Sequence, residues 1–148
     1  MAEQKEFVLA GVVMKQQLSG ADTNGSFSLF ENRSGGQSKT PIHVHADDDE
    51  TLFIIEGELK AIIAGKEQTI KAGESVFLPR GIPHQLMNTS GHPSHYMLLC
   101  TPSGFEGFLA EGGHLKGPDE LVGPPTPEDI ERLKAAAPNF GITLLPGW

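Results

Sequence analysis

Four residues of this chain, His43, His45, Glu50 and His84, have the side chains and the spacing of a metal site. Imidazole nitrogens and a carboxylate oxygen are ligands for divalent transition metals, and four of them leave further coordination positions open. His43 and His45 are two residues apart, so on a β-strand they point to the same face. Glu50 follows across a short polar turn, and His84 follows a turn rich in proline and glycine.

The segments that must position these residues have the pattern of short β-strands joined by turns. The chain contains 18 glycines and 11 prolines, which suits many turns, and several segments alternate polar and apolar residues. This pattern predicts a closed barrel or sandwich. The predicted strands are one or two within Phe7–Leu18, then Ser26–Glu31, a ligand strand at His43–His45, Glu50–Glu56, Glu58–Ala64, Gln68–Ile70, Ser75–Leu78, His84–Asn88 and His95–Thr101.

The residues after this barrel have a different pattern. Phe105–Glu111 is predicted to form a short helix, and a Gly- and Pro-rich connector follows it. Thr126 and Pro127 predict the start of a second helix, with threonine as N-cap and proline at the first helical position. That helix should end near Ala137, because Pro138 cannot continue it. We therefore expect one domain, 1–148, with a barrel at about 7–101 and a helical tail at about 104–148.

The spacing of the chemical residues resembles the two motifs of the cupin superfamily. The first family motif is G-x5-H-x-H-x3,4-E-x6-G, and this chain matches it from His43 to Gly57, with Gly36 one position earlier than the leading glycine. The second, G-x5-P-x-G-x2-H-x3-N, matches at every position from Gly73 to Asn88. The resemblance implies an all-β double-stranded β-helix, the cupin or jelly-roll barrel, with short C-terminal helices outside it. It implies His43, His45, Glu50 and His84 as ligands of one metal ion.

The turn before Glu50 offers alternative carboxylates at Asp47, Asp48 and Asp49. Glu50 is preferred because it has the family's spacing and shares its strand face with the apolar Leu52 and Ile54. The three aspartates are predicted to form a solvated turn. The other histidines lie outside both motifs: we expect His92 to be exposed, His95 to lie at a strand start, and His114 to have no role in the site.

Charge and cysteine content exclude several classes of function. The formal net charge of −8 argues against nucleic acid and anionic membranes as partners. The single cysteine, Cys100, has no partner within the chain for a disulfide and lies in an apolar run, which predicts a core position. Because the apolar run Phe7–Met14 is too short for a signal or a membrane span, we expect a cytoplasmic protein.

The interior of the predicted barrel is apolar, which suits a small, mostly apolar ligand. Its candidate residues are Phe27, Leu29, Leu52, Ile54, Leu59, Ile63, Phe77, Leu86 and Met97.

Within the superfamily, the chain resembles small single-domain quercetinase-like cupins. This resemblance implies a mononuclear dioxygenase for a flavonol-like or other aromatic hydroxylated substrate, with O2 as co-substrate, Glu50 as the catalytic base and a homodimer as the assembly. The metal remains open among Fe, Mn, Ni, Co, Cu and Zn. Two alternatives also remain open: a lyase or isomerase that uses the same site without O2, and a cupin that only binds a small molecule.

Overall fold

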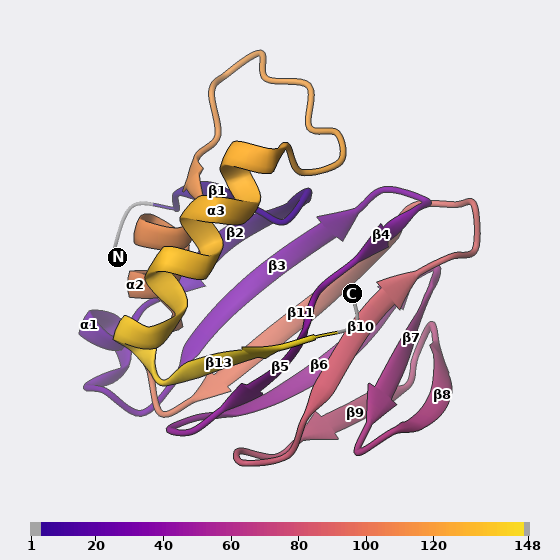
Figure 1. Cartoon of the computed structure of the whole chain (residues 1–148), viewed down its shortest axis with the longest axis horizontal. Coiled ribbons are helices and arrows are strands. Elements are labelled where there is room, and N and C mark those ends of the chain that lie inside the picture. The colour runs from indigo at the N-terminus through magenta and orange to yellow at the C-terminus, as the bar shows by residue number, and fades with distance from the viewer. Residues whose placement is uncertain (1–3, 147–148) are drawn as a thin grey trace.

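The computed structural model describes residues 4–146, which form two antiparallel β-sheets facing each other, with short helices at one end (Figure 1). The predicted mostly β fold with short helices is confirmed. The first sheet, called sheet A, has the strand order β12 (His114–Leu115), β1 (Glu6–Leu9), β2 (Val12–Leu18), β3 (Ser28–Ser34), β11 (Ser94–Thr101), β6 (Asp49–Glu56) and β9 (Ser75–Leu78).

The second sheet, called sheet B, contains the predicted ligand strand. Its order is β13 (Ile142–Leu145), β5 (Ile42–His45), β10 (His84–Asn88), β7 (Glu58–Ile63) and β8 (Lys66–Lys71), and the short β4 (Ser38–Lys39) also pairs with β10. The chain changes sheets several times, and two of these crossings lead from β5 to β6 and from β9 to β10. Both crossings therefore occur beside predicted metal ligands.

The helices are α1 (Gly20–Thr23), α2 (Phe105–Gly112), α3 (Pro127–Ala136) and the 3-10 turn η1 (Ala137–Phe140). α2 and α3 pack against each other near β1 and β2 (Figure 1). α3 begins as predicted, because the Thr126 side chain accepts a hydrogen bond from the backbone N–H of Asp129. Within residues 4–146, no helix has both the length and the apolar character that a membrane crossing needs.

Besides its helices, the tail contains two short strands that were not predicted from the sequence. Ile142–Leu145 forms β13, which pairs with β5 in the register Ile142↔His45, and His114–Leu115 forms β12 at the edge of sheet A. β13 consequently lies directly beside the strand that carries His43 and His45 (Figure 1). A segment of four residues that follows a helix gives too short an alternation to reveal a strand in the sequence.

The core lies between the two sheets, and the predicted interior is correct in part. In sheet B, Leu59 is buried in the core and Leu86 packs against it, as predicted. Leu52 and Ile54 are fully buried, but Phe77 is 55% exposed, and Leu29 and Met97 belong to the outer face of their strands. On β3 and β11 the inward positions are instead held by Phe30, Tyr96, Leu98 and Cys100. These strands have apolar residues on both faces, so alternation alone does not identify the buried one.

Candidate metal centre

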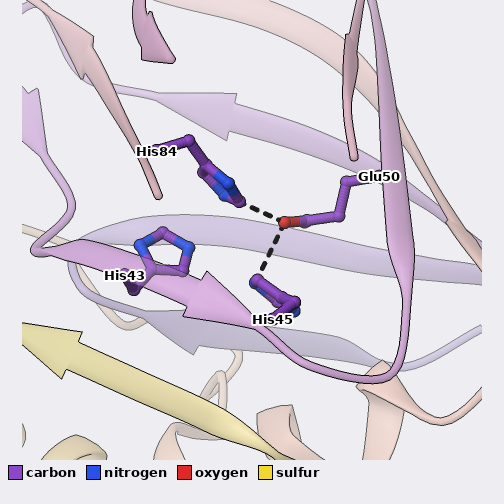
Figure 2. Close-up of side chains that lie close together, drawn as sticks. All are labelled: His43, His45, Glu50 and His84. Atoms are coloured by element: carbon purple, nitrogen blue, oxygen red, sulfur yellow. Dashed lines mark ion pairs between the residues drawn. The ribbon is translucent and has the colours of Figure 1, made fainter. Parts of the chain in front are cut away.

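The four predicted ligands meet in the space between the sheets. His43 and His45 come from β5 and His84 from β10 in sheet B, whereas Glu50 comes from β6 in sheet A. One nitrogen or oxygen atom of each lies within 4.8 Å of the others, and Figure 2 shows the carboxylate of Glu50 directed at the rings of His45 and His84. The structure therefore brings all four residues together, as their spacing predicts.

Two contacts tie the crossing turns to each other and so fix the ligands they carry. The backbone N–H of Gly81 donates to the carbonyl of His45 at 2.8 Å. Asp49, next to Glu50, accepts hydrogen bonds from the backbone N–H and the guanidinium group of Arg80, which hold the pKa of its carboxyl below the usual range. Gly81 has φ +78°, a conformation that side chains disfavour, so the turn before His84 requires glycine.

Hydrogen bonds also orient two of the imidazole rings. Nδ1 of His43 lies 2.8 Å from the carbonyl oxygen of Pro41, which can only accept, so this nitrogen carries the proton. Nδ1 of His45 donates to Oδ1 of Asp48 at 3.0 Å. In both rings Nε2 is left for the cluster, the arrangement that metal-binding histidines have when an outer partner holds the other nitrogen.

Glu50 is a carboxylate buried beside two imidazoles. Its Oε1 lies 3.0 Å from Nε2 of His45 and 3.2 Å from Nε2 of His84. Burial acts to raise the pKa of Glu50, but the charge of His45 and the close contacts with both rings outweigh it and hold this pKa well below the usual range. Burial acts to lower the pKa of His45, yet Glu50 and Asp48 raise it to about 10. These opposite shifts belong to one buried pair, in which a proton on His45 would balance the charge of Glu50.

The pKa of His43 is shifted in the opposite direction to that of His45. Burial, together with the nearby His84, lowers the pKa of His43 to about 4, so this ring is neutral at pH 7. A neutral imidazole with its proton on Nδ1 presents a lone pair on Nε2 to the cluster.

A bound cation fits the chemistry of these four residues. Oε1 of Glu50 and both ring nitrogens of His84 are buried, yet none makes a hydrogen bond of accepted geometry. Buried polar atoms without a protein partner are rare, and they usually bind a water molecule or an ion. A divalent cation would satisfy these atoms and replace the proton as the charge that balances Glu50. Metal binding by His43, His45, Glu50 and His84 stays a prediction.

An apolar cavity opens beside the cluster. It has a volume of about 70 Å³, which is room for a few water molecules. His43, His45 and Glu50 form part of its wall, and most of the rest is apolar. The apolar residues come from both sheets, α2 and β13, and include Leu52, Leu86, Leu98, Phe105, Phe108 and Ile142. A ligand in this cavity would face the cluster directly.

The remaining histidines lie away from the cluster. His95 is on the outer face of β11 and contacts Oε2 of Glu31 at 2.6 Å, and His114 contacts Oε2 of Glu120 at 2.8 Å. His92 is exposed in its turn, as predicted. Cys100 is buried and free, which confirms its core position.

The prediction that Asp47, Asp48 and Asp49 form a solvated turn is wrong for Asp48. The Asp48 side chain is only 15% exposed, because it bonds to His45. Asp49 instead bonds to Arg80, and Asp47 is exposed. The sequence signal for the role of Asp48 is its spacing of three residues from a ligand histidine, which a tight turn converts into a contact.

Asp48→Asn is expected to lower metal affinity by about 10- to 100-fold, the usual effect of losing an outer partner of a metal-binding histidine. The amide of asparagine lacks the negative charge by which Asp48 orients the His45 ring and raises its basicity. Titration with Co(II) would measure the change. Asp47→Asn is the matched control, because it makes the same chemical change in the same turn at an exposed position. Equal affinities of the two variants would show that Asp48 does not support the site.

Residues 30–100, which include the whole cluster, match the Cupin_2 family, described as a cupin domain. Quercetin 2,3-dioxygenase from Bacillus subtilis (strain 168) is 24% identical over 82 residues, which cover 55% of this chain and 24% of that protein. The HTH-type transcriptional regulator PuuR from Escherichia coli (strain K12) is 30% identical over 95 residues, 64% of this chain and 51% of the regulator.

Among solved structures, one described as a predicted oxalate decarboxylase from Thermotoga maritima aligns with a TM-score of 0.60 and 24% identity. The alignment covers 68% of this chain and 94% of that one. The chain spans about a quarter of the length of the quercetin dioxygenase and about half of the regulator. Its relatives thus include an enzyme and a regulator, and the structural likeness concerns the fold.

Proposed function

Since residues 30–100 form a domain of the cupin superfamily, we propose that this protein is a mononuclear metal-dependent dioxygenase. Its substrate would be a small, mostly apolar aromatic compound with a hydroxyl group, such as a flavonol or a catechol. The observation that carries this proposal is the buried carboxylate of Glu50, held between two imidazoles at the wall of an apolar cavity. The similarity to quercetin 2,3-dioxygenase supports the reaction class.

His43, His45, Glu50 and His84 are the residues that would hold the metal. A divalent transition metal there would supply Lewis-acid activation of the substrate hydroxyl and the redox chemistry that O2 requires. Glu50 would accept the hydroxyl proton at its carboxylate, because a carboxylate beside a metal can change from ligand to base. The identity of the metal among Fe, Mn, Ni, Co, Cu and Zn depends on availability as much as on these ligands.

The cavity wall has a separate task in this proposal. Leu52, Phe105 and Phe108 would pack against the aromatic ring and exclude water from the reacting groups. Orientation by such contacts places the substrate hydroxyl toward Glu50 rather than toward solvent. The homodimer that the family resemblance implies is part of the same proposal.

Oxygen uptake by the metal-loaded protein tests the function. The purified protein is analysed for its metal, loaded with it, and mixed with catechol, a flavonol and a non-hydroxylated aromatic compound. We expect oxygen consumption only with a hydroxylated compound, with both oxygen atoms of 18O2 recovered in the product. A matched sample of His84→Ala protein controls for metal that is free in solution.

Two other outcomes would replace the proposal. Conversion of a hydroxylated substrate at the same rate under argon would point to a lyase or isomerase that uses Glu50 to move a proton. Tight binding of these compounds without conversion would point to a binding protein, a reading that the likeness to a regulator supports.

A further inference from the structure

The cavity has a second polar feature, Asn32, away from the metal-ligand cluster. Asn32 lies on β3, its side chain is fully buried, and it forms part of the cavity wall. Neither its amide nitrogen nor its amide oxygen has a hydrogen-bond partner among the described residues. A carboxamide has two N–H donors and an oxygen that accepts twice, so this side chain has a large unused capacity to bind a polar group.

The other fully buried asparagine shows that this lack of partners is particular to Asn32. The amide nitrogen of Asn88 donates to the carbonyl oxygens of Gly35 and His92, both at 2.8 Å. Its amide oxygen accepts from the hydroxyl group of Ser90 at 2.8 Å. Asn88 therefore has a structural role between loops, whereas Asn32 faces a cavity with its donors and acceptor unpaired.

Tyr96 is the cross-strand neighbour of Asn32 in sheet A. Burial raises the pKa of Tyr96 to about 12, against a smaller opposite effect of the Asn32 side chain. The contact between the two falls short of the geometry of a hydrogen bond. Even if the Asn32 amide donated one N–H to the Tyr96 oxygen, its second N–H and its oxygen would stay available for a ligand.

The register of sheet A fixes how far this feature lies from the cluster. Asn32 pairs with Tyr96, which pairs with Ile54, and Ile54 is four residues along β6 from Glu50. At about 3.3 Å per residue and about 4.8 Å per strand, the Cα atoms of Asn32 and Glu50 are roughly 16 Å apart along the sheet. Both side chains line the same cavity, so a ligand that contacts both at once must have polar groups at its two ends.

We propose that Asn32 recognises a second polar group of the ligand, at the end opposite the hydroxyl that faces the metal-ligand cluster. The ligand class is then an aromatic compound with a hydroxyl or carbonyl group at each end of an apolar body. This inference rests on the proposed function for the assignment of the first hydroxyl. Asn32 acts in it as a specificity residue and has no part in moving a proton.

Binding to two matched pairs of probes tests this inference. The pairs are phenol with hydroquinone, and 2-naphthol with 2,6-dihydroxynaphthalene, so each pair differs by one distal hydroxyl. Affinities are measured by calorimetry under argon with Co(II)-loaded wild type, Asn32→Leu and His84→Ala protein. Leucine has the same branched skeleton as asparagine, with two somewhat larger methyl groups in place of the amide nitrogen and oxygen. Asn32→Leu therefore removes the hydrogen bonds and nearly keeps the shape.

We expect wild type to prefer the diol of at least one pair by about tenfold, the effect of one well-placed hydrogen bond. Asn32→Leu should lose this preference while it keeps the metal content and the affinity for the mono-hydroxyl probe. Its melting temperature should be unchanged or higher, because an unsatisfied buried amide has been removed.

Three results would overturn the inference: no preference in wild type, the same preference in Asn32→Leu, or a melting temperature several degrees lower, which would make Asn32 structural. The role of the metal is read separately. Probe binding that survives in His84→Ala with its diol preference would overturn the proposed function and support recognition by Asn32. Binding that requires the metal but shows no diol preference would support the proposed function and overturn recognition by Asn32. Failure of all four probes to bind wild type would overturn both.

Discussion

Glu50→Gln is expected to lower turnover of the substrate found by oxygen uptake by about 100-fold or more, the usual scale for loss of a general base. Glutamine keeps the size of the side chain and an oxygen that can still bind a metal, but it does not accept a proton at neutral pH. Metal content should fall only modestly. The rate is measured at saturating substrate, and the metal by elemental analysis of the same sample.

Glu56→Gln is the matched control for this change. Glu56 lies on the same strand, β6, but is exposed at its far end, so the same loss of charge should leave turnover unchanged. Near-full turnover in Glu50→Gln would contradict the assignment of Glu50 as base. Because Asp48 contacts His45, Asp48→Asn is unsuitable as a control here.

His84→Ala should remove most of the metal from the purified protein. The substitution takes away one of four ligands, so the affinity should fall by more than the roughly 10- to 100-fold caused by losing an outer partner. Metal content after dialysis measures this, and the circular dichroism spectrum should show that the sheets persist. His43→Ala and His45→Ala should behave alike.

The control for the histidine series is the pair His92→Ala and His114→Ala. Both residues lie outside the cluster, one exposed in a turn and the other beside Glu120, so both variants should keep full metal content. Full metal occupancy in His84→Ala would show that the cluster is not the metal site.

His43 and His45 could be paired from the sequence because residues i and i+2 share a strand face. Glu50 and His84 were added by the spacing of the cupin motifs, which no local rule supplies. Asp48 and Asn32 were missed as functional residues for different reasons. The contact of Asp48 with His45 depends on the geometry of one turn. Asn32 stands out only because no neighbouring strand provides a hydrogen-bond partner for its amide, which the sequence does not reveal.

The faces of sheet A show a further limit of sequence reasoning. Phe53, Ile55 and Phe77 are large apolar residues that lie 43% to 55% exposed on its outer side. Alternation places such residues on one face but does not say whether that face is covered. On β6 the buried face could be predicted, because Glu50 was assigned to the interior and Leu52 and Ile54 share its face. The strands β3, β9 and β11 contain no predicted ligand that would identify their buried face.

The pairing of β13 with β5 has a consequence for how the protein folds. Its two strands lie about 100 positions apart along the chain, and contacts of such long range form slowly because a large loop must close first. We therefore expect the strand that carries His43 and His45 to obtain one of its two neighbours late in folding. Because Ile142 also belongs to the cavity wall, the cavity would be completed only when this pairing forms.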